Sequence, residues 1–202
     1  MPILALVILA TWLVLVVGLR GYLHHRRTGQ VPVPPPAASG SPQMWARLAS
    51  ALGLILAFAA PIGDWLGLDR MDALDQPAVQ LAGAVIAIAG IVGALISQAA
   101  MGDAWRPDVI PGDHTELLTN GPFRLVRNPV LTSTAGTVIG LALLVPNVLA
   151  LAMLACFLLG IQIQVHLVEE PHLLRVHGDA YRRYAARTGR YLPLIGRLRE
   201  LE

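Results

Sequence analysis

The longest uncharged stretch of the chain is too long to cross a membrane once. Residues 128–168 contain no Asp, Glu, Lys or Arg over 41 positions. As a single helix they would extend about 60 Å, twice the roughly 30 Å hydrocarbon thickness of a bilayer. Pro146 and Asn147 form the strongest turn signal within the stretch, because proline interrupts a helix. The stretch is therefore predicted to form two membrane helices joined as a tight hairpin at this turn.

Three further apolar stretches precede the hairpin, and each is long enough for one crossing. They cover residues 3–19, 45–65 and 77–100. The first has no basic start and no small-residue cleavage site, so it is interpreted as a retained span. Overall, 55% of the residues are hydrophobic and 14% charged, whereas soluble domains carry about 25% charged residues. The predicted fold is all-α: a polytopic membrane protein with five transmembrane helices and a cytoplasmic C-terminal helical segment.

The arginines predict the orientation of these spans. An odd number of spans places the first connection, the third connection and the C-terminal tail on one side, and these are the basic segments. The second connection, residues 64–76, holds four aspartates and one arginine. The positive-inside rule makes the basic side cytoplasmic and places the N-terminus on the outer side. The expected location is the inner (plasma) membrane of the cell. Within the third span, Gly83, Gly90 and Gly93 predict close packing against another helix.

Two polar segments flank the predicted hairpin, at residues 102–129 and 166–193. Because a hairpin returns the chain to the face that it left, we expect these segments to lie together. His166 and Glu170 are four residues apart and share one face of a helix. Glu169 points about 100° away from Glu170. We therefore expect one glutamate to face a pocket and the other to pair with an arginine.

Several classes of function are not expected. The net charge of +2 is too small for a nucleic-acid-binding surface. The histidines and glutamates near residue 170 lack the spacing of a zinc site, so no metal is predicted. Cys156 is the only cysteine, which leaves no disulfide within the chain. No glycine-rich phosphate loop follows a predicted strand, which excludes the nucleotide folds of soluble enzymes.

Two sequence patterns carry a family resemblance. Residues 114–129, HTELLTNGPFRLVRNP, resemble the LVTxGPYRYVRHPxYxG signature of membrane methyltransferases of the isoprenylcysteine carboxyl methyltransferase and phospholipid methyltransferase group. Farther on, the glutamate pair and the residues after it resemble that group's EExxLxxxFGxxYxxY and terminal LP patterns. The resemblance covers residues 98–195. Two positions depart from it: Asn128 replaces the histidine before the proline, and Leu131 replaces a tyrosine.

The resemblance implies S-adenosylmethionine as methyl donor and S-adenosylhomocysteine as product. Glu170 and Arg187 are the implied catalytic residues, and Arg187 would orient an anionic acceptor group. The implied cofactor-binding residues are Leu118, Gly121, Arg127, Asn128, Pro129, His166, Glu169, Glu170, Tyr181 and Tyr184. A carboxylate suits the ribose or amino group of the cofactor, an arginine suits its carboxylate, and Tyr181 suits its adenine. The implied substrate is a lipophilic small molecule or a prenylated compound that reaches the site among membrane lipids.

The acceptor group favoured by this resemblance is the carboxylate of an isoprenylcysteine-like compound or of another lipid acid, and amine and hydroxyl acceptors stay open. Residues 1–100 would then hold three transmembrane helices and a proline-rich loop, and residues 101–202 the catalytic region. Two other functions stay open. One is an NADPH-dependent enzyme similar to sterol reductases, which are normally about twice as long; the other is a non-enzymatic helical subunit or small transporter. The arginines also fit lipid-phosphate contacts, and the tyrosines fit an interfacial belt.

Overall fold

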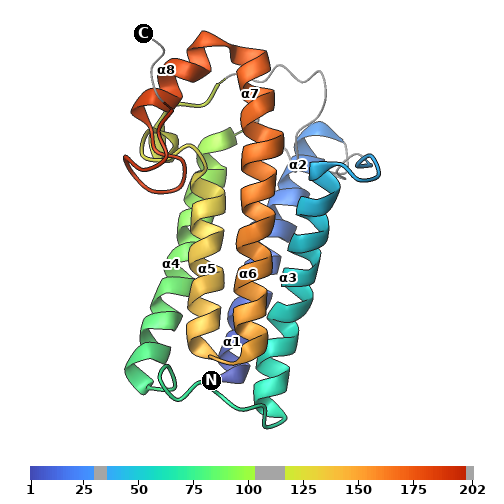
Figure 1. Ribbon diagram of the computed structural model, residues 1–202, viewed down its shortest axis with the longest axis vertical. Helices are drawn as coiled ribbons and strands as arrows, with labels where there is room; N and C mark the ends of the chain where they lie inside the picture. The colour runs from blue at the N-terminus through green and yellow to red at the C-terminus, as the bar shows by residue number, and fades with distance from the viewer. Residues whose placement is uncertain (30–35, 103–116, 199–202) are drawn as a thin grey trace.

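The computed structural model describes residues 1–29, 36–102 and 117–198. These ranges form helices and loops, and they contain no strand beyond two isolated bridges. The long helices run side by side along one axis (Figure 1). The predicted all-α class is confirmed. Much of the predicted proline-rich loop and the start of the 114–129 motif lie outside the described residues.

The helices follow the predicted order. They are α1 (Pro2–Trp12), a π-helical turn (Leu13–Leu19) and α2 (Arg20–Thr28); α3 (Pro42–Trp65); α4 (Pro77–Met101); a short 3₁₀ turn (Gly121–Arg124); α5 (Pro129–Leu144); α6 (Val148–Ile163), a second π-helical turn (Gln164–Glu169) and α7 (Glu170–His177); and α8 (Asp179–Arg187). Four helical bodies are long and apolar enough to cross a membrane: Pro2–Thr28, Pro42–Trp65, Pro77–Met101 and Val148–His177. With 16 residues, α5 is about 24 Å long, shorter than the predicted fourth span. The chain is a multi-pass membrane protein.

The hairpin turn lies where the sequence predicts it. Helix α5 ends at Leu144, and Asn147 caps the start of α6 by accepting a hydrogen bond from the backbone nitrogen of Ala150 at 3.0 Å. The Asn147 amide nitrogen also donates to the carbonyl of Ala60 in α3 at 2.9 Å. This side chain is fully buried. One residue therefore ends the turn, starts α6 and ties the hairpin to α3.

Glycines allow α4 and α5 to pack in close contact. A Cβ atom added at Gly90 would lie 2.5 Å from the carbonyl oxygen of Ser133 and 2.6 Å from the backbone nitrogen of Thr137. The close packing predicted for the third span is thereby confirmed. Helix α3 lies along α6 in the same bundle. The predicted regions 1–100 and 101–202 thus share one helical bundle, and their division into two functional regions stays a prediction.

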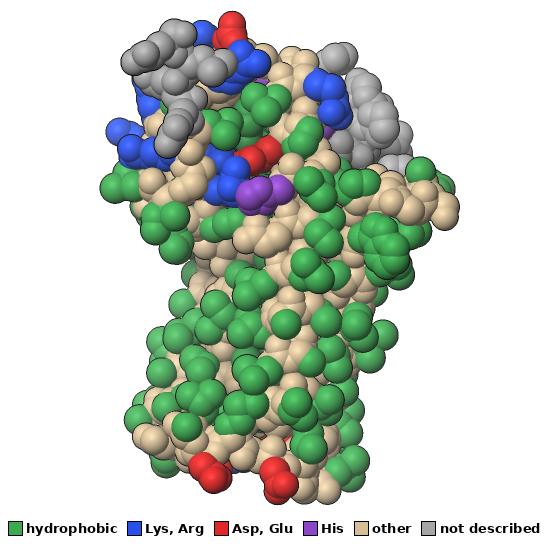
Figure 2. All heavy atoms as spheres, in the orientation of Figure 1, with side chains coloured by type: hydrophobic (Ala, Val, Ile, Leu, Met, Phe, Trp, Pro, Cys, Tyr) green, Lys and Arg blue, Asp and Glu red, His purple; other side chains and the backbone are tan. Residues whose placement is uncertain are grey.

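Charge is distributed unequally between the two ends of the bundle. Arginine side chains gather at the end that holds α8, and acidic side chains mark the opposite end (Figure 2). At this acidic end, Arg70 donates to Asp64 and to Asp75, each at 2.9 Å. The N-terminus lies at the same end (Figure 1). The end that holds α8 is called the arginine-rich end below; its assignment to the cytoplasm stays a prediction.

Candidate active site

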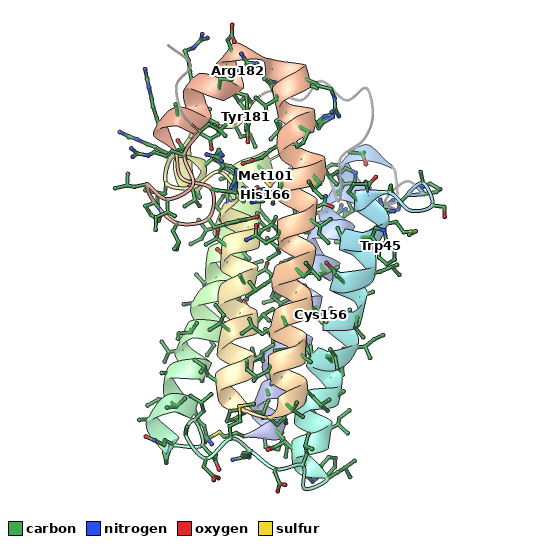
Figure 3. All side chains as sticks on the ribbon, viewed as in Figure 1. Trp45, Met101, Cys156, His166, Tyr181 and Arg182 are labelled. Atoms are coloured by element: carbon green, nitrogen blue, oxygen red, sulfur yellow. The ribbon has the colours of Figure 1, made fainter. Side chains whose placement is uncertain are left out.

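A cavity of about 640 Å³ opens at the arginine-rich end. Its wall combines residues from α1, its π-helical turn and α2, from α4, from the segment before α5 and the start of α5, and from α6, the second π-helical turn, α7 and α8. Met101, His166 and Tyr181 lie at this end of the bundle, whereas Cys156 lies about midway along it (Figure 3). The two polar segments that flank the hairpin are brought together here, as the sequence predicts.

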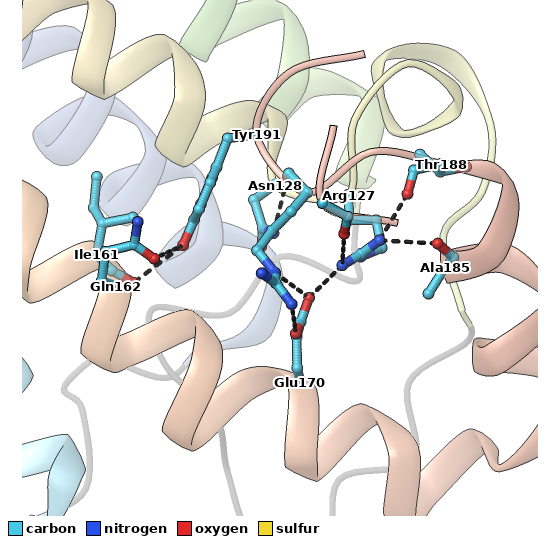
Figure 4. Close-up of polar contacts among 10 residues, drawn as sticks. Arg127, Asn128, Ile161, Gln162, Glu170, Ala185, Thr188 and Tyr191 are labelled. Atoms are coloured by element: carbon cyan, nitrogen blue, oxygen red, sulfur yellow. Dashed lines mark hydrogen bonds and ion pairs between the residues drawn. The ribbon is translucent and has the colours of Figure 1, made fainter. Parts of the chain in front are cut away.

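Glu170 is the centre of a buried ion-pair network in the cavity wall. Its Oε1 accepts from Arg127 Nη2 at 2.6 Å and from Arg190 Nε at 2.8 Å, and its Oε2 accepts from Arg190 Nη2 at 2.7 Å (Figure 4). The side chains of Glu170 and Arg127 are both buried. Hydrogen bonding to Glu170 raises the pKa of Arg190 above its ordinary value. The cationic form of Arg190 is thus stabilised at any physiological pH.

The second function of Arg127 is to hold the C-terminal loop in place. Its guanidinium donates to the carbonyl oxygens of Ala185 at 3.1 Å, Thr188 at 2.7 Å and Gly196 at 3.1 Å. The backbone nitrogen of Arg127 also donates to the carbonyl of Gly189 at 2.8 Å. Residues far apart in the sequence are therefore fixed around one guanidinium group, which also pairs with Glu170.

Asn128 adds further hydrogen bonds between the residues before α5 and the C-terminal loop. Its backbone nitrogen and its side-chain Nδ2 both donate to the carbonyl of Arg190 at 3.2 Å. The bend at Gly189 requires glycine, because an added Cβ would lie 2.8 Å from the backbone nitrogen of Leu194. The asparagine at the family's histidine position thus holds the backbone of the residue that pairs with Glu170. Leu131 contributes apolar surface to the cavity.

Tyr181 and Tyr184 close the cavity on the side of α8. Their rings are 6.2 Å apart in an edge-to-face arrangement, and the Tyr184 hydroxyl donates to the carbonyl of Phe123 at 2.6 Å. Burial raises the pKa of Tyr184 to about 12, and burial raises the pKa of Tyr181 above its ordinary value as well. Both phenols are therefore neutral. Each contributes an aromatic ring and one hydroxyl group to the cavity wall.

Glu169 differs from its neighbour Glu170. It is half-buried, lines the cavity and accepts from Gln164 Nε2 at 3.2 Å. Glu170, by contrast, is buried between two arginines. Both glutamates line the cavity, and Glu170 is the one that pairs with Arg127 and Arg190.

The structure places the sequence-predicted site residues in two groups. Those that line the cavity are Leu118, Arg127, Asn128, Pro129, Glu169, Glu170, Tyr181 and Tyr184. Gly121, His166 and Arg187 are not among its lining residues. Gly121 has a positive φ of 58° and starts the 3₁₀ turn that carries Phe123. The side chains of His166 and Arg187 are exposed.

Arg190 is the functional candidate that sequence reasoning missed. Both Arg187 and Arg190 lie between Tyr184 and Pro193, so spacing alone does not distinguish them. The structure does, because α8 ends at Arg187 and the following turn brings Arg190 against Glu170. The signal available in the sequence was Gly189, which permits that turn. Gln98 and Trp12 also line the cavity and were not singled out.

The fold of this chain is similar to that of a solved membrane enzyme. The solved structure of the eukaryotic intramembrane Ras methyltransferase, isoprenylcysteine carboxyl methyltransferase, aligns with 97% of this chain and 70% of its own at 18% identity, with a TM-score of 0.59. The two chains thus share a fold. Residues 79–180 match the phospholipid methyltransferase family, and the chain belongs to that family. No curated protein matches the chain.

Proposed function

We propose that this protein transfers a methyl group from S-adenosylmethionine to a lipophilic acceptor in the cavity at the arginine-rich end. The observation that carries the proposal is the buried network of Glu170, Arg127 and Arg190 in the wall of a cavity that also borders apolar helices. A volume of about 640 Å³ lies within the range of roughly 300–1,000 Å³ typical of small-molecule sites. Membership of a methyltransferase family supports the same reaction.

The residues in the wall fit this cofactor chemically. The Nε atom of Arg127 is buried and has no hydrogen-bond partner among the described residues, so it is a candidate donor to the cofactor carboxylate. Glu169 supplies a carboxylate suited to an amino group or a ribose diol. Tyr181, Leu118 and Pro129 supply apolar surface suited to adenine. The described part of the chain thus offers groups suited to the carboxylate, to the amino group or ribose, and to the adenine of the cofactor.

The cofactor supplies an electrophilic methyl group on a sulfonium, and the chain supplies position and a dry environment. Glu170 and its two arginines fix the C-terminal loop against α5, which keeps the cavity wall rigid. A carboxylate acceptor needs no base, because the anion attacks directly and opposite charges neutralise each other in the transition state. An amine or hydroxyl acceptor needs a base, and Glu169 is a carboxylate in the cavity wall that could serve.

Binding of the reaction product tests the proposal. S-adenosylhomocysteine should raise the melting temperature of the detergent-solubilised protein, since a ligand that binds the folded state stabilises it by mass action. NADPH should leave the melting temperature unchanged, which separates this function from that of a sterol-reductase-like enzyme. Absence of a shift with millimolar S-adenosylhomocysteine would refute the proposal. Labelled-methyl transfer into a lipid extract then measures the reaction itself.

A further inference from the structure

Two buried polar atoms on the α1 and α4 side of the cavity are not used by the network around Glu170. Oε1 of Gln98 and Nε1 of Trp12 are both buried and have no hydrogen-bond partner within the described ranges. Both residues line the cavity. Buried polar atoms in folded proteins are nearly always hydrogen-bonded. Each atom is therefore a candidate for contact with a ligand.

The orientation of the Gln98 side-chain amide is fixed. Gln98 is 5% exposed, and its Nε2 donates to the carbonyl oxygen of Val16 at 3.0 Å. Because a carbonyl oxygen only accepts hydrogen bonds, the amide group cannot be reversed without losing this bond. Oε1 must therefore be the atom left over, and it only accepts. A partner for Gln98 must carry an O–H or N–H donor.

Trp12, which lines the same cavity, needs a hydrogen-bond acceptor instead of a donor. Its indole nitrogen only donates, so its partner must carry an acceptor. Trp12 precedes Val16, which Gln98 contacts, by four residues, about 6 Å along a helix. Gln98 of α4 thus bonds to the N-terminal helical segment about one turn beyond Trp12, and both residues line the same cavity. A neutral group that both donates and accepts, such as a secondary amide or a hydroxyl, matches the pair.

A second, smaller cavity indicates which part of a ligand meets this pair. It measures about 250 Å³ and lies among α1, α3, α5 and α6, with apolar walls that include Ala57, Leu141 and Met153. Trp12, Thr134 and Phe157 line both cavities. No charged side chain is among the residues that line the smaller one. An amphiphile with its reactive group near Glu169 and its tail in the smaller cavity would place its linking group at Trp12.

We propose that Gln98 and Trp12 select acceptors that carry a secondary amide or a hydroxyl between the reactive group and the hydrocarbon tail. This inference rests on the proposed function, because it assigns the pair to the methyl acceptor. The charged and aromatic wall formed by Arg127, Glu169 and Tyr181 is the part suited to the cofactor. The pair lies on the other side, where the cavity meets apolar helices, and there the acceptor binds.

Two probes that differ by one donor test this inference. N-hexadecylacetamide carries the N–H and the carbonyl, whereas N-hexadecyl-N-methylacetamide keeps the carbonyl and lacks the N–H. Binding to the full chain in lipid nanodiscs is measured at saturating S-adenosylhomocysteine. We expect the secondary amide to bind about tenfold more tightly, as for one buried hydrogen bond. Equal affinity for the two probes would overturn the proposal.

Three variants locate the preference. Gln98→Met should abolish the difference between the probes, and Trp12→Phe, which keeps an aromatic ring and leaves the bond between Gln98 and Val16 intact, should weaken both probes by about tenfold. Ser97→Ala is the matched control, because Ser97 is buried beside Gln98 and, among the described residues, its hydroxyl donates to Gly93 of its own helix. If Gln98→Met prevents folding, Trp12→Phe still tests the pair.

Separate readouts distinguish the two proposals. Loss of S-adenosylhomocysteine binding in Trp12→Phe, with probe binding intact, would assign the pair to the cofactor and overturn this inference. Absence of any S-adenosylhomocysteine binding to the unmodified protein would instead refute the proposed function. The preference between the two amides is also measured in nanodiscs without S-adenosylhomocysteine, so that it can be judged independently of that result.

Discussion

Arg190 forms a bidentate ion pair with Glu170, with Nε 2.8 Å from Oε1 and Nη2 2.7 Å from Oε2. A two-point contact fixes the plane of a carboxylate, and Arg127 adds a third bond to the same group at 2.6 Å. The network joins α7, the residues before α5 and the C-terminal loop. The shape of the cavity wall therefore depends on this network.

Replacing Arg190 should affect methyl transfer more than replacing Arg187. We expect Arg190→Ala to lower transfer by about 100-fold, roughly 2.7 kcal/mol in activation free energy, because Glu170 loses its two-point partner. Arg187→Ala changes an exposed side chain outside the cavity and should retain activity within a few-fold. Labelled-methyl transfer into membrane lipids measures both. The reverse ranking would restore Arg187 to the catalytic role that the family resemblance implies.

Removing the charge of Glu170 should destabilise the fold. Glu170→Gln keeps the size of the side chain but leaves two arginines facing a neutral amide, and breaking a buried pair in this way costs about 3–5 kcal/mol. The melting temperature in detergent should fall accordingly. Glu169→Gln is the matched neighbour; because Glu169 is only half-buried, this variant should lower the melting temperature less and should weaken S-adenosylhomocysteine binding. A stable Glu170→Gln protein would show that the network is not needed for folding.

Asn147 should be the residue on which the hairpin most depends. Asn147→Ala removes the cap of α6 and leaves the carbonyl of Ala60 without its donor, a loss of about 1–3 kcal/mol in unfolding free energy. Denaturant titration in mixed micelles measures the change. Asn120→Ala, at an exposed position, should have little effect. Similar stabilities for the two variants would contradict this account of the turn.

High pH should destabilise the arginine-rich end through its tyrosines. Tyr184 has a pKa of about 12 in the folded protein against an ordinary value of 10.0. Between these values the folded state holds a proton that the unfolded state has lost, so stability falls as pH rises. The fall due to Tyr184 is about 1.4 kcal/mol per pH unit. Below pH 10 this residue should add no pH dependence.

Melting temperatures across this pH range test the assignment. Tyr184→Phe should flatten the alkaline part of the profile, although it also removes the hydrogen bond to the Phe123 carbonyl and lowers stability at neutral pH. Tyr22→Phe, at an exposed position in α2, serves as the control. An alkaline profile unchanged by Tyr184→Phe would rule out the proposed cause.

The sequence by itself determined the helices and their hairpin. Uncharged runs as long as a bilayer is thick allow only membrane helices, because every backbone polar group must be bonded internally there. Pro146 and Asn147 set the turn for equally local reasons. The sequence also brought residues 102–129 near residues 166–193, since a hairpin returns to its starting face.

Only the tertiary structure decided which side chains meet there. The choice of Arg190 over Arg187 as partner of Glu170 depends on the turn at Gly189 and on its backbone bond to Arg127, a contact between segments about 60 residues apart. No local pattern encodes such a contact. The orientation of Gln98 is likewise set by Val16, from a different helix. Helix positions follow from hydrophobicity along the chain, whereas the cavity wall follows from the packing of separate helices.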